Sequence, residues 1–440
     1  MTVLRFGLTP KMKPVSPRRS AAVAALDIGT SKIVCVIARL EPQGPQDVLR
    51  RRSHGVQVLG FAHIAAGGMK AGGVVDAVEV EEMVRQAIEI AESKARVQLV
   101  SVVVSLSGGR PGSERFVATV DLAGSAVTAG DIGRVLAAGS RHSVRAGRAI
   151  LHSLPIGYSL DAVTGIREPR GMLGRRFGVD MHMVTADAAV VRNLMLVVER
   201  SHLEIEALVA APYVAGLSAL ADDEADLGAA CVDLGAGTTT LAVFSGGKFV
   251  HADGFALGGQ HVTLDLARGL NTRIADAERI KAIYGSVLGG GSDERDMITV
   301  PPVGDDEREP PQFVSRASVM RIIKPRVEEI LEMVRDRLKN SPFAAEPRAR
   351  VVLTGGASQL AGIAELAACI LRRPVRIGRP LGLAGLPEAG KGPAFAVAAG
   401  LLVYPQAAHL EHFEPRRTRQ LMTGTGGYMA RVGQWLRESF

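Results

Sequence analysis

The sequence predicts an α/β fold with two similar halves around a cleft, and three observations point to it. The stretches "VAALDIGTSKIVCVIARL" (23–40) and "GAACVDLGAGTTTLAVFSGGK" (228–248) share one pattern: an apolar strand, Asp-x-Gly, a hydroxyl-rich turn and a second apolar strand. Strands and amphipathic helices follow the first stretch in the order of an α/β layer. With 440 residues and 47% hydrophobic content, the chain can bury roughly two to four domain cores.

Residues 1–20 predict a disordered basic arm. They contain no acidic residue and no hydrophobic periodicity, and they carry five of the seven net positive charges, at Arg5, Lys11, Lys13, Arg18 and Arg19. The rest of the chain is close to neutral, so we expect no nucleic-acid partner. Three single cysteines in apolar runs favour buried thiols in a reducing compartment: Cys35, Cys231 and Cys369.

The first half continues with a predicted helix over 79–97. Its apolar residues recur on one face, at Val80, Met83, Val84, Ala87, Ile88 and Ala91. A buried strand is expected over 100–108. From about Ser105 to Thr185 the pattern changes to short strands, a helix near 131–140 and glycine-rich turns, which predicts a small inserted α+β module. A buried helix over 187–201 then leads to the second hairpin.

The second half contains a Gly-, Pro- and acid-rich stretch over 285–311, which predicts a loop or a small subdomain. A long helix follows, with one apolar face formed by Ile323, Val327, Ile330, Leu331, Val334 and Leu338. In "VVLTGGASQLAGI" (351–363) a buried strand meets a glycine pair and a helix that starts near Ser358. The last body helix is expected over 394–404, and a polar, basic linker follows Pro405.

The two hairpins have the chemistry of a polyphosphate site. Glycine lets the backbone come close to a ligand, and the free N–H groups of a tight turn form an anion-binding nest. An aspartate beside phosphates needs a cation between them, so Asp27 and Asp233 each indicate Mg²⁺, held through water. One such hairpin is more often an ordinary glycine turn, whereas two copies facing each other can hold a polyphosphate from both sides. Lys32 reads equally well as a phosphate contact or as an exposed turn lysine.

These segments, in this order, resemble the actin, Hsp70 and sugar-kinase superfamily: "LDIGTSK" and "VDLGAGTTT" as phosphate segments and "LTGGASQL" as the adenosine segment. In "DAERIKAIYG" the resemblance implies that Glu278 and Lys281 reach the sugar and base of the nucleotide, although an exposed ion pair would have the same spacing. The residues expected around ATP and Mg²⁺ are Asp27, Gly29, Thr30, Ser31, Lys32, Asp233, Gly235, Gly237, Thr238, Thr239, Gly259, Glu278, Lys281, Gly355, Gly356 and Ala357.

Within this superfamily the chain resembles the FtsA family of bacterial cell-division proteins. The similarity is carried by "LHSLPIGYSLD", "GIREPRGMLGRR", "FALGGQHVTLDLARGL" and "RIIKPRVEEILEMV", and it extends from about Ala21 to Phe440. It implies an actin-like two-lobed fold with duplicated ribonuclease-H-like domains, an inserted 1C module and a C-terminal amphipathic helix. The expected units are 21–104 with 183–209 (1A), 105–182 (1C), 210–270 with 320–404 (2A), 271–319 (2B), a linker over 405–426 and the helix over 427–440.

The tail "GYMARVGQWLRESF" has the pattern of a short membrane-binding helix. On a helical wheel the apolar side chains cluster on one side, with two arginines beside them: Tyr428, Met429, Val432, Trp435, Leu436 and Phe440, flanked by Arg431 and Arg437. A terminal helix docked on the body is the simpler interpretation. The basic tether before it favours an anchor on an anionic membrane instead.

The resemblance also implies partners and a place in the cell. The family tethers filaments of the division GTPase FtsZ to the inner face of the cytoplasmic membrane at the division site, by binding the FtsZ C-terminal peptide, and it polymerises and recruits later division proteins. Between Glu206 and Asp222 there is no acid, Gln or His to orient water, so we expect ATP binding with slow turnover and no catalytic residue. The alternative is a sugar-type kinase of the same fold, with Asp233 as the base.

Overall fold

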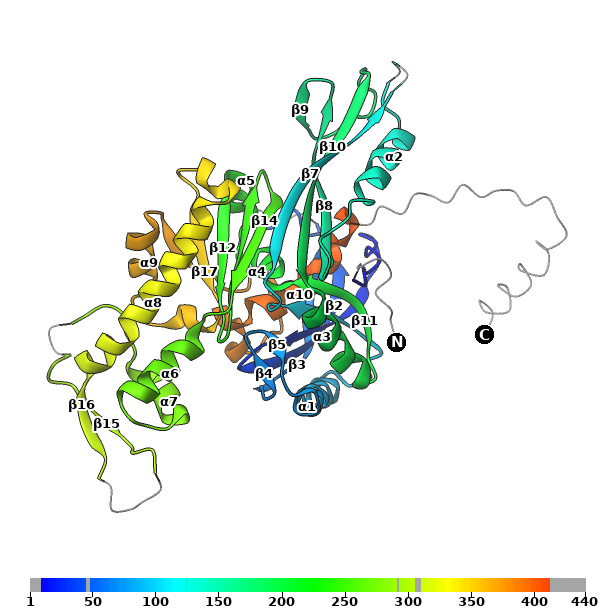
Figure 1. Ribbon diagram of the computed structural model, residues 1–440. Coiled ribbons are helices and arrows are strands. Elements are labelled where there is room, and N and C mark those ends of the chain that lie inside the picture. The colour runs from blue at the N-terminus through cyan, green and yellow to red at the C-terminus, as the bar shows by residue number, and fades with distance from the viewer. Residues whose placement is uncertain are drawn as a thin grey trace.

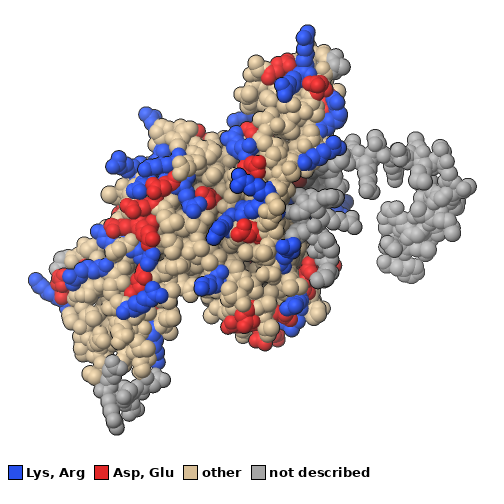
Figure 2. All heavy atoms as spheres, in the orientation of Figure 1, with Lys and Arg blue, Asp and Glu red and all other residues tan. Residues whose placement is uncertain are grey.

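The computed structural model describes residues 9–44, 48–122, 124, 126–290, 293–304 and 310–411. Two lobes of sheet and helix lie side by side, a small module projects from one end, and a two-stranded hairpin lies at the opposite end (Figure 1). Basic and acidic side chains are intermixed over the face drawn in Figure 2, as expected for a body with little net charge.

The first lobe is built on one sheet with the strand order β11-β6-β1-β2-β3-β19. Strand β2 runs antiparallel to both of its neighbours, β1 and β3. The other pairs are parallel: β6 with β1, β11 with β6, and β19 with β3. The strands are β1 (Ala21–Ile28), β2 (Lys32–Pro42), β3 (His54–Ala65), β6 (Ser101–Leu106), β11 (Glu204–Ala210) and β19 (Leu383–Ala384). Helices α1 (Ala77–Ala95) and α3 (Ala188–Arg200) pack against this sheet and against each other.

The second lobe repeats this arrangement. Its strands have the order β18-β17-β12-β13-β14, which corresponds strand by strand to β11-β6-β1-β2-β3 of the first lobe. In both lobes the first three strands along the chain are followed across the first strand by the fourth and then the fifth. The strands are β12 (Ala229–Leu234), β13 (Thr239–Ser245), β14 (Lys248–Phe255), β17 (Arg350–Thr354) and β18 (Val375–Ile377). Helices α6 (Gly259–Gly269), α8 (Arg316–Lys339) and α9 (Ile363–Leu371) complete it. The prediction of two similar α/β halves is therefore confirmed.

Two apolar helices join the lobes. Helix α4 (Ala211–Ala219) contacts β12 and β13 of the second lobe, and α10 (Ala396–Ala407) contacts α4 as well as β1 and β6 of the first lobe. Among the described residues, Pro393–Leu410 is long and apolar enough to cross a membrane, with a mean hydropathy of 1.2, but 72% of this window is buried inside the protein. Because its side chains pack into the body, this segment is a core helix.

The inserted module is confirmed as a small α+β unit. It consists of β7 (Gly112–Asp121), α2 (Ala129–Gly139), β8 (Arg148–Leu160), β9 (Val163–Ile166) and β10 (Arg176–Asp187). Its core is its own, formed by seven buried apolar residues such as Val135, Phe177 and Met181. A single pairing of Gly112 with Asp253 joins its sheet to β14 of the second lobe.

Short elements complete the described chain. Helix α7 (Ile274–Tyr284) and the hairpin β15 (Met297–Val300) with β16 (Gln312–Ser315) lie beside α6 and α8. The remaining elements are β4 (Met69–Lys70), β5 (Gly73–Val74), α5 (Asp222–Leu227) and the 3-10 segments η2 (Pro342–Ala345), η3 (Gly356–Gln359), η4 (Glu388–Lys391), η5 (Pro393–Phe395) and η6 (Ala408–Leu410).

Local sequence patterns predicted the buried faces of the long helices correctly. All six apolar residues expected on one face of α8 are buried. In α1 five of the six are buried, and Met83 is partly buried against the same core. Cys35 and Cys231 are buried as expected, whereas the expectation for Cys369 is wrong, because this residue is exposed on α9.

The expected disordered arm is wrong for residues 9–20. Thr9 and Met12 are buried. The backbone N–H and the hydroxyl of Thr9 both donate to the carbonyl of Ile150, at 3.3 and 3.0 Å. The basic composition concealed this order, because Lys11 finds its acceptors in a distant part of the chain.

The expected boundaries after residue 380 also need correction. The linker predicted from 405 is wrong for residues 405–411, because Pro405 lies inside α10 and both Ala408 and Glu411 are buried. Strand β19 pairs in parallel with β3, so this part of the expected 2A range lies in the first lobe. The helix expected from Ser358 is one 3-10 turn, η3, and α9 begins at Ile363.

Candidate functional site

The two Asp-x-Gly hairpins have the same geometry. In the first, the N–H of Gly29 donates to the carbonyl of Lys32 at 2.9 Å, and in the second the N–H of Gly235 donates to the carbonyl of Thr238 at 2.9 Å. The registers also agree, since Asp27 pairs with Val34 and Asp233 pairs with Thr240, seven residues on in each case. Each aspartate is therefore the penultimate residue of the first strand, two residues before the glycine that begins the turn.

The turns of the two hairpins contact each other across the lobes. A Cβ atom placed on Gly237 would lie 2.5 Å from Oγ1 of Thr30, so only a glycine permits this approach. The same Oγ1 accepts the backbone N–H of Gly72 at 3.1 Å, which fixes its position. Two segments more than 200 residues apart in sequence are thus brought to one place.

A cavity of about 1240 Å³ opens at this contact, somewhat larger than an ordinary small-molecule pocket. Residues from both hairpins, from α6, from α7 and from the turn after β17 line it. Fifteen of the sixteen residues expected around the nucleotide are among them: Asp27, Gly29, Thr30, Ser31, Lys32, Asp233, Gly235, Thr238, Thr239, Gly259, Glu278, Lys281, Gly355, Gly356 and Ala357. The exception, Gly237, contributes through its contact with Thr30.

The two aspartates share an electrostatic environment that disfavours their ionised forms. Burial raises the pKa of Asp27, against the opposing effects of a hydrogen bond from the Ser105 hydroxyl (2.5 Å) and the charge of Lys32. Burial and the neighbouring charge of Asp27 raise the pKa of Asp233 to about 7, again against Lys32. Two carboxylates that repel each other in a buried place leave a position that a cation would stabilise.

The residues present fit a Mg²⁺ ion that takes most of its ligands from elsewhere. In the described part of the chain no three His, Cys, Asp or Glu side chains gather into a metal-binding group. Asp27 and Asp233 supply only two carboxylates, and Mg²⁺ ordinarily combines one or two carboxylates with water and phosphate oxygens. This donor set therefore suits an ion that enters together with a phosphate ligand.

The glycine pair after β17 packs directly against the second aspartate. Gly355 has a φ of +86°, which L side chains rarely adopt, and a Cβ atom there would lie 2.5 Å from Oδ1 of Asp233. Gly356 then opens η3 on the cavity wall. Close approach to the carboxylate of Asp233 therefore explains Gly355, whereas a Cβ atom on Gly356 would meet nothing closer than the Cβ of Ala394 at 4.0 Å.

Glu278 and Lys281 form an ion pair and also face the cavity. Lys281 Nζ lies 2.6 Å from Oε2 of Glu278, and it donates to the carbonyl of Gly259 at 3.2 Å and to the hydroxyl of Thr263 at 2.8 Å. Thr263 also donates to Glu278. The ion pair and the ligand-facing position are thus compatible, and the lysine ties α7 to the first turn of α6.

Several cavity-lining residues were not predicted. Gln260 follows the Gly258-Gly259 pair at the start of α6, and this glycine pair is the local sequence pattern that could have predicted its position at the cavity. Ser107 directly follows the buried strand β6 and lines the cavity. Arg316, whose Nε donates to the carbonyl of Tyr284 at 3.1 Å, gave no local signal. The residues of the expected membrane helix, from Tyr428 to Phe440, lie outside the described residues.

Comparisons with known proteins agree with this architecture. A family model described as "Cell division protein FtsA" matches residues 230–400, and one described as "SHS2 domain inserted in FTSA" matches residues 108–185. The cell division protein FtsA of Agrobacterium fabrum is 51% identical over 436 residues, covering 99% of this chain and 98% of the relative. The FtsA of Escherichia coli is 32% identical over 425 residues, covering 95% and 98%.

Solved structures support the fold. A chain of the PilM–PilN type IV pilus biogenesis complex has a TM-score of 0.59 and 19% identity, covering 87% of this chain and 98% of its own. MreB 5 of Spiroplasma citri bound to AMPPNP has a TM-score of 0.52 and 14% identity, covering 88% and 97%. The fold is therefore the actin-like one, and the near full-length similarity to curated relatives shows that this chain belongs to the FtsA family of cell division proteins.

Proposed function

We propose that the cleft binds ATP together with Mg²⁺, and that the bound nucleotide acts as an assembly ligand of a cell-division protein. The observation that carries this proposal is the convergence of two identically built Asp-x-Gly turns on one cavity, with Thr30 against Gly237. The turns would hold the phosphates through their N–H groups and hydroxyls. Asp27 and Asp233 would hold the hydrated ion, and Glu278 and Lys281 would face the sugar and base.

Bound Mg²⁺ would supply positive charge between the aspartates and the phosphates. The protein's own contribution is to keep two carboxylates buried and close together, at an energetic cost in the absence of a cation. Lys32, which lies over the ring of Phe395 at 5.2 Å, adds a fixed positive charge at the same end.

Slow hydrolysis fits the wall of the cleft. The first residue of α4, Ala211, lines the cavity and has no group that could orient a water molecule. The neutral polar side chains that line the cavity include Gln260, Gln359, Thr30 and Ser107, and none of these four is a general base. We expect a turnover well below about one per second, the lower end of ordinary enzyme rates.

Nucleotide binding can be tested with single charge-removing variants. The protein is titrated with ATP, with Mg²⁺ and with EDTA, and binding is followed by calorimetry. Asp233→Asn should weaken Mg²⁺-dependent binding at least about tenfold, or 1.4 kcal/mol. The control is Asp223→Asn, which removes an exposed carboxylate paired with Arg50 away from the cavity. Equal affinities of Asp233→Asn and the wild type would refute the proposal.

The division role follows from the family. The chain polymerises, binds the C-terminal peptide of FtsZ, recruits later division proteins and attaches to the cytoplasmic face of the inner membrane through residues 427–440. One helix of this length binds lipid weakly, so a polymer carrying many copies would bind through avidity. The division relatives named above lend no support to the sugar-kinase alternative. Transfer of labelled phosphate from ATP to a sugar would support that alternative instead.

Membrane attachment is tested by sedimentation with vesicles that contain anionic lipids. Trp435→Glu should release the protein from the vesicles, because it places a charge on the apolar face, while ATP affinity stays unchanged. Trp435→Phe keeps the apolar bulk and is the matched control. Undiminished sedimentation of the Glu variant would remove the proposed anchor.

A further inference from the structure

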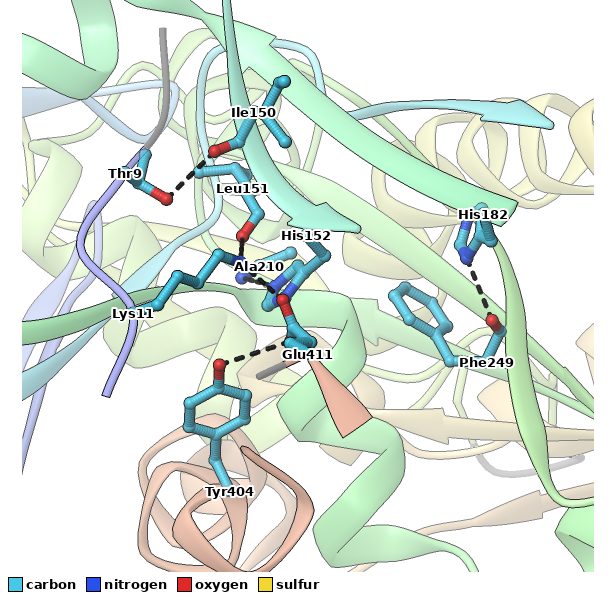
Figure 3. A network of polar contacts seen from close by, with 10 residues as sticks. All are labelled: Thr9, Lys11, Ile150, Leu151, His152, His182, Ala210, Phe249, Tyr404 and Glu411. Carbon is cyan, nitrogen blue, oxygen red and sulfur yellow. Dashed lines mark hydrogen bonds and ion pairs between the residues drawn. The ribbon is translucent and has the colours of Figure 1, made fainter. Parts of the chain in front are cut away.

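A buried polar cluster lies behind the cleft, outside the site described above. Its ionisable members include Lys11, His152 and Glu411, and they come from the N-terminal segment, from β8 and from the segment after α10 (Figure 3). The side chains of His152 and Glu411 are 0% and 2% exposed. A buried carboxylate is costly unless its charge is compensated and its oxygens accept hydrogen bonds, so the partners of Glu411 decide whether this cluster is stable.

Both oxygens of Glu411 have partners. Oε1 lies 2.7 Å from Nδ1 of His152 and accepts the hydroxyl of Tyr404 at 3.2 Å. Oε2 accepts Nζ of Lys11, which also donates to the carbonyl of Leu151. We name the three residues Lys11, His152 and Glu411 the clasp. It ties together three segments that are hundreds of residues apart in sequence.

The clasp reaches the wall of the cleft through His152. Nε2 of His152 accepts the backbone N–H of Ala210 at 2.9 Å, so Nδ1 carries the proton and donates to Glu411. Ala210 is the last residue of β11, and the next residue, Ala211, is the first of α4 and lines the cavity. The imidazole thus holds the backbone at the start of α4, directly behind the cavity.

Aromatic rings keep the imidazole in this orientation. Tyr213 of α4 lies edge-on to His152 with ring centroids 5.2 Å apart, and Phe249 stacks on Tyr213 at 4.5 Å. The same α4 packs along α10, whose Tyr404 reaches Glu411. Movement at the start of α4 would therefore displace His152, and with it the segment 405–411.

We propose that His152 is a positioning residue for the cleft, and that the clasp couples occupancy of the cleft to the segment 405–411, which leads into residues 412–440. This inference rests on the proposed nucleotide site. A nucleotide that contacts the start of α4 would stabilise the hydrogen bond from Ala210 to His152, and through Glu411 it would order the segment 405–411. By reciprocity, fixing the segment 405–411 would raise nucleotide affinity by the same factor.

Hydrogen exchange of the full chain, with and without ATP and Mg²⁺, tests the coupling. In the wild type, nucleotide should slow exchange in peptides covering 207–213 and 400–411 by about fivefold or more, the lower end of ordinary allosteric couplings. In Lys11→Met and Glu411→Gln the effect should persist at 207–213 and be lost at 400–411. Lys11 is a quarter exposed, so the first variant is the milder change and the one better suited to keep the fold.

His182→Gln is the matched control. His182 is equally buried, and it bonds to the carbonyl of Phe249 without touching Glu411 (Figure 3). Its Nε2 also bonds to the hydroxyl of Ser113. This variant should keep the nucleotide effect at 400–411, whereas His152→Gln should lose it. A wild type that binds ATP but shows no change at 400–411 would overturn the inference alone. A wild type that binds no ATP would overturn the proposed function and the inference together.

Discussion

The cleft and the clasp both contain buried carboxyl groups, but the negative charge of these groups is compensated differently in the two places. In the cleft, burial raises the pKa values of the Asp27 and Asp233 carboxyl groups, and the charge of Asp27 raises that of Asp233 further, against the opposing charge of Lys32. In the clasp, Glu411 is as deeply buried, but its interactions with His152 and Lys11 outweigh the effect of burial and lower its pKa to about 2. Burial alone therefore does not distinguish a ligand site from a structural one.

The difference lies in where the compensating charge comes from. In the clasp, Lys11 supplies the positive charge, and both carboxylate oxygens of Glu411 already have partners within the protein. No position is left there for a ligand. The cleft keeps more negative charge than the protein compensates, beside a cavity of about 1240 Å³. A group of charges that is stable only with an external cation is suited to binding, and one that is complete is suited to holding segments together.

Removing the acid should have opposite consequences in the two places, and the largest effect is expected in the clasp. Glu411→Ala leaves the buried His152 without its acceptor and removes the charge partner of Lys11, which should lower the free energy of unfolding by roughly 3 to 5 kcal/mol. Urea unfolding followed by circular dichroism measures it. The comparison fails if Glu411→Ala is as stable as the wild type.

The next largest effect is a stabilisation of the ligand-free protein by Asp233→Asn at high pH. Because the pKa of Asp233 is raised from 3.8 to about 7, its stabilising contribution is present below pH 3.8 and is lost as the pH rises through 7. At pH 8 the variant should exceed the wild type by at most about 4 kcal/mol, at about 1.36 kcal/mol per pKa unit. The difference should shrink towards pH 5, as urea midpoints across this range would show.

The clasp has the opposite pH dependence. Burial lowers the pKa of His152 below 6.5, although Glu411 opposes this and Lys11 adds to it, so the contribution of His152 is present above pH 6.5 and lost as the pH falls. The groups facing it are Lys11, Glu411, Tyr213 and Tyr404. In His152→Gln the free energy of unfolding should therefore fall less steeply below pH 6.5 than in the wild type. An unchanged slope would show that folding does not change the pKa of His152.

The smallest effect is expected at the edge of the cleft. Glu278 is 55% exposed and already paired with Lys281, so Glu278→Gln removes at most one ligand contact. ATP affinity should fall by about 0.5 to 1.5 kcal/mol, the net value of one hydrogen bond. An unchanged affinity would show that Glu278 makes no contact with the nucleotide and only pairs with Lys281. Calorimetric titration at fixed Mg²⁺ resolves the two outcomes.

Much of the cleft was predictable from the sequence, because its chemistry lies in short contiguous motifs. Both hairpins and the glycine pair after β17 were recognisable from strand patterns and turn residues, and these segments line one cavity. Ser107, Gln260 and Arg316 were missed, because a single polar residue at the end of an element carries no local signal. The buried face of α8 was recognisable for the same reason as the hairpins, since its periodicity repeats within one helix.

The sequence by itself determined the two α/β halves, the inserted module and the paired acidic turns, because each depends on interactions between near neighbours in the chain. Only the tertiary structure decided that Lys11 and Glu411 are ordered and that β19 belongs to the first lobe. Lys11 looked like part of a basic arm and Glu411 like part of a polar linker. From sequence alone a charged residue is predicted to be exposed, because its partner is not known. Here the two partners, Lys11 and Glu411, are 400 residues apart in the chain.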